Sequence, residues 1–217
     1  MIAPPQKRFG ATQLFAPAID RLVPRSVLVR RGPAERRRVA LTFDDGPHEL
    51  TSEYLDLLGE LGVPATFFVV GELCIDRRAE LDQMVRAGHE VGGHGFSHRA
   101  FPRLTRAVVM DELVRTTALL PSASRLVRPP FGEFSPRSIL FTALAGYTTC
   151  LWSLDSDDCR TERAADVAGR VSAGIAPGDI VLLHEGQRWT LEALPQIVRA
   201  LKEASYSLVT VSALIRG

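Results

Sequence analysis

The sequence predicts a parallel α/β protein that folds as a single domain around a closed or nearly closed barrel of about seven strands. After Arg38, short runs rich in β-branched and aromatic residues alternate with amphipathic segments, which is the pattern of successive βα units. No internal repeat, low-complexity tract or interdomain linker interrupts the chain after residue 38. An open, doubly wound sheet is the alternative that the same pattern allows.

The strands and helices are expected to follow one another regularly. The predicted strands are residues 39–43, 65–70, 90–93, 126–128, 147–154, 180–184 and 207–210. The predicted helices are residues 52–61, 76–87, 106–120, 137–145, 162–173 and 191–204.

Capping residues support these helix boundaries. Thr105 precedes one predicted helix, and Ser135-Pro136 opens another with proline at its first position. Three helices are expected to end at a glycine that adopts the left-handed conformation: Gly62, Gly88 and Gly146.

The composition is that of an ordinary globular protein. Of the 217 residues 46% are apolar and 24% charged, with 26 basic against 25 acidic side chains, which excludes intrinsic disorder, collagen-like repeats and a disulfide scaffold. A chain of this length can fold without a metal, so a metal would serve chemistry. Cys74, Cys150 and Cys159 match neither a zinc-knuckle nor a redox spacing, and we interpret them as core or surface residues.

The N-terminal segment is electrostatically distinct. Residues 1–38 hold nine basic and two acidic side chains, a charge of +7, and residues 1–37 are predicted to form a basic extension. Apolar residues recur there at helical spacing, at Leu14, Phe15, Ala18, Ile19, Leu22 and Val23. The preferred interpretation is a helix packed on the body of the protein, and the alternative is peripheral contact with an anionic membrane.

Targeting signals are missing from the sequence as it stands. No apolar run has the length of a membrane span, and the first ten residues lack the apolar core of a secretory signal. We therefore expect a cytoplasmic protein, or an extracytoplasmic one if the N-terminus has been trimmed. The sequence offers no nucleic-acid-binding motif, and its basic residues are concentrated in one tail.

Polar residues gather where the predicted strands end, and parallel α/β folds place their active sites at these ends. The first strand ends in Asp44-Asp45-Gly46, so strand alternation would send two neighbouring carboxylates in different directions. One carboxylate could then bind a metal while the other holds a water.

The third strand leads into His94 and His98, four residues apart in a glycine-rich segment. Two imidazoles and one aspartate form the three-ligand, open-position geometry of a catalytic zinc site. We therefore predict a divalent metal, zinc or alternatively cobalt.

Three further strand ends complete the predicted site. Arg128 opens a Pro-Pro-Phe-Gly turn that can hold a guanidinium against a carboxylate and present a backbone N–H to an oxyanion. Trp152 and the acidic residues from Asp155 onward follow the fifth strand, and His184 closes the sixth. An aspartate from the adjacent strand end would orient His184 and raise its pKa, as a general acid requires.

Together these motifs resemble, in order and over about residues 38–212, those of the polysaccharide deacetylases, carbohydrate esterase family 4. The resemblance implies a distorted (β/α) barrel and assigns residues 38–217 to the NodB homology domain. It implies metal-dependent hydrolysis of an N-acetyl group from an amino sugar in a glycan or chitooligosaccharide, with release of acetate.

The resemblance also implies the role of each site residue. Asp44 would be the catalytic base, positioned by Arg128, and His184 the catalytic acid, oriented by Asp155. The metal ligands would be Asp45, His94 and His98, and the backbone N–H of Phe131 would bind the oxyanion. Leu182 would form a wall of the acetyl pocket, and we expect Trp152 to contact substrate as well.

Three positions depart from the family pattern. Gly95 replaces a serine or threonine, Cys159 replaces a tryptophan, and Glu185 replaces an aspartate. The missing tryptophan removes a large apolar side of the pocket. Two alternatives therefore accompany the deacetylase hypothesis: a deformylase or deacetylase of a lipid-linked sugar at the membrane, and a catalytically inactive sugar-binding barrel.

Overall fold

The computed structural model describes residues 23–122 and 124–216. The predicted amphipathic segment over residues 14–23 lies, apart from Val23, outside the described residues. Its packing and its membrane contact therefore stay predictions.

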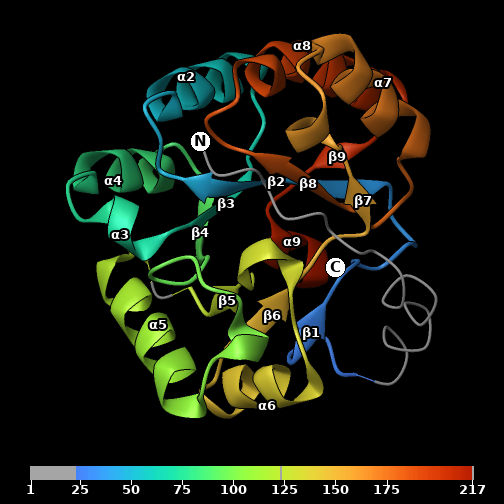
Figure 1. The fold of residues 1–217 in the computed structure, drawn as a ribbon. Coiled ribbons are helices and arrows are strands. Elements are labelled where there is room, and N and C mark those ends of the chain that lie inside the picture. The colour runs from blue at the N-terminus through green and yellow to red at the C-terminus, as the bar shows by residue number, and fades with distance from the viewer. Residues whose placement is uncertain (1–22, 123, 217) are drawn as a thin grey trace.

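Within the described ranges, nine strands form one parallel sheet that curls into a half-barrel (Figure 1). The strands lie in the order β1-β6-β5-β4-β3-β2-β8-β7, and β9 pairs with the start of β2. Their bounds are β1 Leu28–Val29, β2 Arg38–Gly46, β3 Thr66–Val69, β4 Glu90–Gly93, β5 Leu126–Val127, β6 Thr148–Cys150, β7 Leu154–Asp155, β8 Ile180–His184 and β9 Ser207–Leu208. The predicted α/β class and distorted barrel are confirmed.

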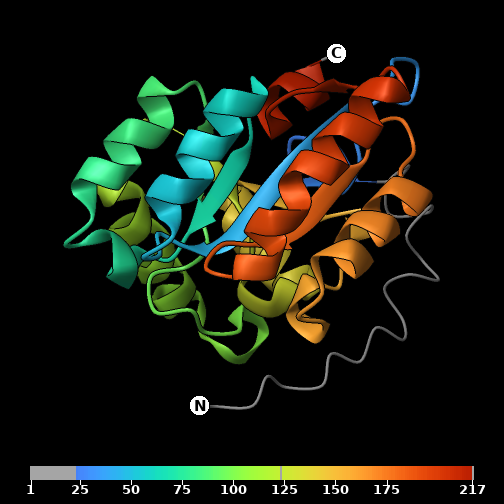
Figure 2. The ribbon, with the colours of Figure 1, turned by 90° about the horizontal axis from the view of Figure 1, so that it is seen from above.

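Helices cover the outside of the curled sheet (Figure 1), and Figure 2 shows the long α8 running alongside β2. Their bounds are α2 Thr51–Leu61, α3 Gly71–Cys74, α4 Arg78–Arg86, α5 Arg106–Leu119, α6 Pro136–Leu144, α7 Ala164–Gly174, α8 Arg188–Glu203 and α9 Val211–Arg216. The predicted caps are confirmed: Thr105 accepts from the Val108 N–H, Ser135 forms a capping box, and Gly62, Gly88 and Gly146 have positive φ. None of the helices within the described ranges combines the length and apolarity that crossing a bilayer requires.

Strand alternation on β2 separates the core from the site. Val39, Leu41 and Phe43 are fully buried in the cluster that the sheet forms with the surrounding helices. Thr42 and Asp44 point to the opposite face, where both contact the guanidinium of Arg128. One strand therefore anchors the core with one face and, through Thr42 and Asp44 on the other, places polar groups inside the barrel.

The predicted strand over residues 147–154 is wrong as a single element. It is two strands, because the chain leaves β6 beside β5 and crosses to pair with β8 as β7. Ser153 lies at this crossing, where its amide donates to the Ile180 carbonyl and its hydroxyl to Asp179. The crossing and the antiparallel bridge between Arg31 and Asp179 bring the open ends of the sheet together.

Part of the predicted N-terminal extension belongs to the body of the protein. Leu28 and Val29 form β1, pair with Thr149 and Cys150 on β6, and are 5% and 1% exposed. The predicted helix over residues 76–87 begins later, at Arg78, after the separate short α3. The C-terminal α9 was not predicted.

The three cysteines behave as their spacing indicated. Cys74 and Cys150 are buried, Cys159 is exposed, and no two of the three are joined in a disulfide.

Candidate active site

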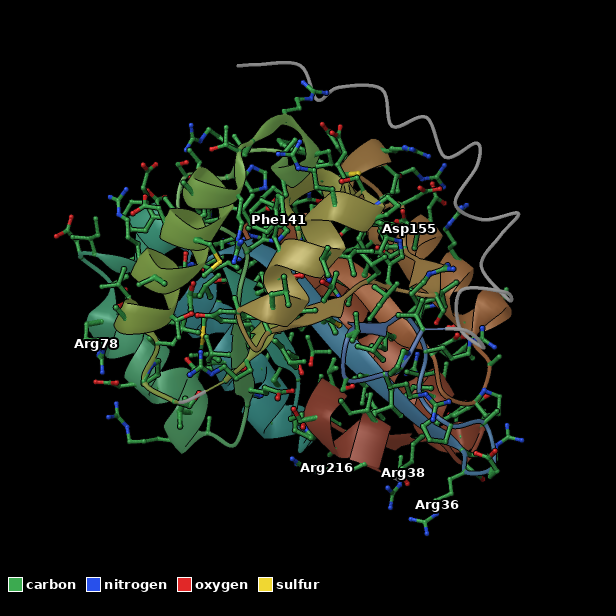
Figure 3. The ribbon with its side chains drawn as sticks, turned by 90° about the horizontal axis from the view of Figure 1, so that it is seen from below. Arg36, Arg38, Arg78, Phe141, Asp155 and Arg216 are labelled. Carbon is green, nitrogen blue, oxygen red and sulfur yellow. The ribbon has the colours of Figure 1, made fainter. Side chains whose placement is uncertain are left out.

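The site lies at the carboxyl ends of β2, β4, β5 and β8. The parallel register aligns these ends, because Asp44 on β2 pairs with His184 on β8 and Gly93 on β4 pairs with Val127 on β5. The last residues of β2 and β8 and the residues that follow β4 and β5 therefore enter the same space. The opposite end of the barrel holds a separate cavity lined by Pro33, Glu35, Arg36, Arg38 and Leu214, and Figure 3 shows Arg36 and Arg38 at this end of the molecule.

A β-bulge brings both neighbouring aspartates to this space. Two residues of β2, Asp45 and Gly46, oppose the single residue Val69 of β3, and Asp45 adopts a positive φ of 72°. A bulge of this kind redirects a side chain at a strand end. Asp45 thus escapes the alternation that would have turned it away from Asp44.

Asp45, His94 and His98 converge on one point. The Asp45 Oδ1 atom lies 3.3 Å from His94 Nε2 and 3.1 Å from His98 Nε2. One ligand atom from each of the three residues lies within 4.8 Å of the others. Burial alone would raise the pKa of Asp45, but hydrogen bonds with His94 and His98 hold that pKa well below its usual value.

The donor set fits a divalent metal. His94 Nδ1 lies 2.8 Å from the Arg128 carbonyl, and because a carbonyl only accepts, Nδ1 carries a proton. When a metal takes the place of the Nε2 proton, the neutral imidazole therefore has its lone pair on Nε2, the nitrogen nearest Asp45. Two imidazole nitrogens and one carboxylate are a zinc-type donor set with an open position. The structure therefore brings together the three predicted ligands in a form that can hold a metal.

Asp44 is buried beside this trio and paired with Arg128. Arg128 Nη1 donates to Asp44 Oδ1 at 2.6 Å and to Thr42 Oγ1 at 2.8 Å, and the arginine is fully buried. The other carboxylate oxygen of Asp44, Oδ2, lies 3.7 Å from His94 Nε2. Arg128 thus fixes one oxygen of Asp44 and leaves the other facing the candidate metal site.

His184 is held by Asp158. The His184 Nδ1 atom lies 2.7 Å from Asp158 Oδ1, and the His184 amide donates to Asp158 Oδ2 at 2.7 Å. Burial alone would lower the pKa of His184, but the Asp158 carboxylate and the nearby Asp45 and Asp44 raise it to about 9. The imidazole is therefore positively charged at neutral pH.

The predicted partner of His184, Asp155, is wrong. Asp155 ends β7, and its Oδ1 accepts the amide of Asp157 at 2.9 Å. The chain then turns through Asp157, whose φ is 55°, into a short 3-10 helix that directs Asp158 at His184. Figure 3 shows Asp155 beside α7, where its carbonyl accepts from Arg170.

Phe131, Leu182 and Trp152 line the same region. Phe131 has an unusual φ of 61° and packs its ring 4.5 Å from that of His98. Leu182 is on the same face of β8 as His184, two residues before it, and is buried. Trp152 lies against Gly132, where a Cβ would be only 2.3 Å from its ring.

Comparisons with known proteins agree with this arrangement. The sequence profile of the polysaccharide deacetylase family matches residues 31–150. The chain belongs to the polysaccharide deacetylase family, carbohydrate esterase family 4. As a member it is a carbohydrate N-deacetylase, of a class that typically depends on a metal.

Relatives of this deacetylase differ in length. It is 36% identical over 184 residues to a chitooligosaccharide deacetylase of Sinorhizobium fredii, covering 82% of each chain. It is 31% identical over 204 residues to the peptidoglycan-N-acetylglucosamine deacetylase PgdA of Listeria monocytogenes, covering 89% of this chain but only 42% of that longer protein. The crystal structure of a peptidoglycan N-acetylglucosamine deacetylase superposes with a TM-score of 0.84 at 27% identity, covering 88% of this chain and 94% of the other.

Glu112 is a residue of this deacetylase that sequence reasoning missed. It lies on α5, is 1% exposed, and accepts from the amides of Phe96 and Ser97 at 2.7 and 2.9 Å. It also accepts from the Ser97 hydroxyl at 2.6 Å and from Arg99. This carboxylate therefore holds the loop between the two histidines of the candidate metal site.

Gly95 fits the same loop. Its φ is 77°, and a Cβ there would lie 3.2 Å from the Pro130 ring and 3.4 Å from Glu112 Oε2. Only glycine adopts this backbone at no cost. Glycine at position 95, where the family pattern has serine or threonine, therefore suits the backbone of the loop that Glu112 holds.

Glu185 supports the turn that carries Asp45. Its Oε1 accepts from the His48 amide at 3.1 Å and from the Thr51 hydroxyl, and its side chain lies against Gly46. Burial raises the pKa of Glu185 to about 7. No sequence signal other than its position after His184 pointed to this role.

Proposed function

We propose that this deacetylase removes the acetyl group from N-acetylglucosamine units of a glycan, with chitooligosaccharides or peptidoglycan as the substrate class and zinc as the metal. One observation carries the proposal: one trio and two pairs of side chains meet at the carboxyl ends of the strands. These are Asp45 with its two histidines, Asp44 with Arg128, and His184 with Asp158.

Lewis-acid polarisation of the acetyl carbonyl and of the attacking water is the chemistry that a divalent cation at Asp45, His94 and His98 supplies. Asp44 is proposed to take the proton of the water through Oδ2, the oxygen that faces His94 at 3.7 Å. Arg128 donates to Oδ1, so it positions the base through the oxygen that does not take the proton.

The acid is proposed to be His184. A pKa of about 9 keeps the imidazole protonated at neutral pH, so it can deliver its proton to the departing amine. Asp158 accepts from Nδ1, which leaves Nε2 as the nitrogen that faces the reaction. Replacing a general acid costs roughly 10²–10⁴ in rate, and we expect that loss for His184→Ala with the metal retained.

The oxyanion is proposed to bind the backbone N–H of Phe131, because the positive φ of Phe131 turns this peptide within a rigid proline-flanked turn. Leu182 and Trp152 are proposed to contact the acetyl group and the sugar. The inactive-barrel alternative is opposed by the presence of the ligands, the base and the acid together.

Acetate release tests this function. We expect purified protein with one equivalent of zinc to release acetate from chitooligosaccharides or from peptidoglycan fragments, and each product to lose the mass of one acetyl group per acetate. Chelation should stop the release and added zinc restore it. Stoichiometric metal binding without acetate from either glycan would contradict the proposal, and formate from a formylated sugar would favour the deformylase alternative.

A further inference from the structure

The turn over residues 128–132 serves three parts of the active site. The Arg128 carbonyl accepts from His94 Nδ1 at 2.8 Å, and the Arg128 guanidinium donates to Asp44 Oδ1 at 2.6 Å. The backbone N–H of Phe131 is the proposed oxyanion donor. The separation between the base and the oxyanion donor therefore depends on the shape of the 128–132 turn.

The backbone of this turn is left-handed at its end. Its φ is 61° at Phe131 and 62° at Gly132. A residue other than glycine adopts such a conformation at a cost and keeps it only where the surrounding structure holds it. Two hydrogen bonds close the turn, from the Gly132 amide to the Pro129 carbonyl at 3.0 Å and from the Glu133 amide to the Pro130 carbonyl at 3.1 Å. Both bonds are local, so contacts from other elements hold the turn against the rest of the site.

The indole of Trp152 contacts both ends of the turn. A Cβ on Gly132 would lie 2.3 Å from Cη2 of the indole, so the ring lies directly against the Gly132 backbone. The guanidinium carbon of Arg128 lies 5.5 Å from the centre of the same ring system, within the range of a cation–π contact. One side chain thus contacts the group that holds the base and the end of the turn that carries the oxyanion donor.

The guanidinium of Arg128 is restrained in its plane and over its face. It donates through Nε to the Cys150 carbonyl at 3.3 Å and through Nη2 to the Leu151 carbonyl at 3.2 Å, and these two residues directly precede Trp152. The ring of Phe68, fully buried on β3, lies 4.1 Å from the guanidinium carbon. Because the hydrogen bonds run in the plane of the guanidinium, the aromatic rings are what restrict its movement out of that plane.

We propose that Trp152 is a positioning residue for the reaction, because it holds the Arg128 guanidinium and the Gly132 backbone in one arrangement. In this way it sets the separation between the base Asp44 and the backbone N–H of Phe131. Its effect on the reaction rests on the proposed function, which assigns those two groups their roles. The role is separate from the proposed contact of Trp152 with the sugar: a binding contact acts on KM, whereas a misplaced base or oxyanion donor acts on kcat.

Amide hydrogen exchange tests the positioning without relying on activity. The probes are the Gly132 and Glu133 amides, whose hydrogen bonds close the turn. We expect both to exchange faster in Trp152→Leu than in the wild type, while the amides of β2 and β8 keep their wild-type rates. Phe141→Leu is the matched control, because it removes a ring whose centre lies 5.2 Å from the guanidinium carbon of Arg137 on α6, away from the turn. Wild-type exchange of both amides in Trp152→Leu, or faster exchange throughout the sheet, would overturn the proposal.

Steady-state kinetics of acetate release, with bound zinc measured in the same samples, test the effect on the reaction. We expect Trp152→Leu to keep one equivalent of zinc and its kcat to fall by as much as about 10²-fold, the scale of a misplacement of about 1 Å at a reacting group. Trp152→Phe retains an aromatic face and should recover part of this loss, and Phe141→Leu should have the wild-type kcat.

A raised KM at wild-type kcat in Trp152→Leu would reduce the role of Trp152 to sugar binding and overturn the positioning role. Loss of zinc from both Trp152 variants would also overturn it, since the indole would then support the metal site. An absence of acetate release by the wild type would count against the proposed function and leave the result of the hydrogen exchange standing.

Discussion

The charge on His184 depends on one buried carboxylate. Asp158 is fully buried, and its carboxylate accepts hydrogen bonds from the His184 ring, the His184 amide and the Thr190 hydroxyl. These three hydrogen bonds fix its position. A carboxylate held in this way stabilises the protonated imidazole and raises its pKa. The acid and its partner therefore act as one unit.

Asp158→Asn should move the basic limb of the pH–rate profile toward neutral pH, because the amide no longer stabilises the charged imidazole and the pKa of His184 falls from about 9. The measurement is kcat against pH with the metal content checked at each end. Asp155→Asn is the matched control, and its basic limb should stay with that of the wild type. If the basic limb moves in Asp155→Asn and not in Asp158→Asn, Asp155 is the partner of His184, as the sequence had predicted.

The same pair makes stability depend on pH. The pKa of His184 in the fold, about 9, lies above its ordinary 6.5, so the fold binds the proton more tightly than the unfolded chain does. The contribution of the pair is complete below about pH 6.5 and is lost as the pH rises through about 9. Denaturant unfolding of the wild type and Asp158→Asn should therefore differ most at acidic to neutral pH and converge above pH 9, and a constant difference would contradict this.

Single residues show where sequence reasoning about the site succeeded and failed. Asp45, His94 and His98 were predictable because adjacent strand ends and short spacing carry the metal-ligand pattern. The choice between Asp155 and Asp158 was not, because both follow the same strand and only the turn at Asp157 decides which one meets His184. Glu112 looked like any acid of an exposed helix, since its partners come from a distant loop.

At the scale of elements, α5 positions the loop between the two histidines. Glu112 lies in the middle of this helix and accepts hydrogen bonds from Phe96 and Ser97 in the loop and from Arg99 just after it. Burial alone would raise the pKa of Glu112, but these hydrogen bonds lower it, so the carboxylate is charged at neutral pH. A shift of α5 or loss of the charge would therefore move His98.

Glu112→Gln should weaken metal binding by roughly 10–100-fold, the usual cost of a lost supporting contact around a metal site. The glutamine keeps the shape but replaces one acceptor oxygen with a donor that faces N–H groups. Metal affinity is measured by competition with a chromophoric chelator. Asp111→Asn, at a neighbouring position on the exposed face where the aspartate pairs with Arg115 of the same helix, is the control. Equal affinities in the two variants would contradict the role of Glu112.

Elements differed in how well the sequence predicted them. The strands at 90–93 and 180–184 were predicted with the bounds of β4 and β8, because glycine or polar residues follow a short apolar run. The run over 147–154 stays apolar through Leu151 and Trp152, so the break between β6 and β7 left no local signal. The two-residue β1 lies in a segment dominated by arginine, where charge concealed the strand.

At the scale of the whole molecule, the N-terminal strand closes the edge of the half-barrel. Leu28 and Val29 bury their side chains against the sheet, and Arg31 pairs with the buried Asp179 just before β8, the strand next to the other edge. The body of the deacetylase thus begins well before residue 38. The contacts of residues 28–31 with the sheet decide where the N-terminal extension ends, and the amino-acid composition of the segment does not reveal these contacts.

Removing residues 1–30 should destabilise the protein relative to removing residues 1–22. The difference between the two truncations is the loss of β1, and burial of a leucine and a valine contributes roughly 1.5–3 kcal/mol each. For a chain of this size we expect the melting temperature to fall by about 2–4 °C per kcal/mol. The measurement is thermal unfolding of both truncated proteins, and equal melting temperatures would show that β1 adds nothing to the fold.

The measurement that tests the central claim most directly is acetate release and bound metal in the same samples of Asp44→Asn and Asp45→Asn. If Asp44 is the base and Asp45 a ligand, Asp44→Asn keeps its metal and loses roughly 10²–10⁴ in rate, as for loss of a general base. Asp45→Asn should lose both metal and activity. Asp44→Asn losing its metal together with its activity, or Asp45→Asn keeping its metal at wild-type affinity, would contradict the division of roles between these two neighbouring carboxylates.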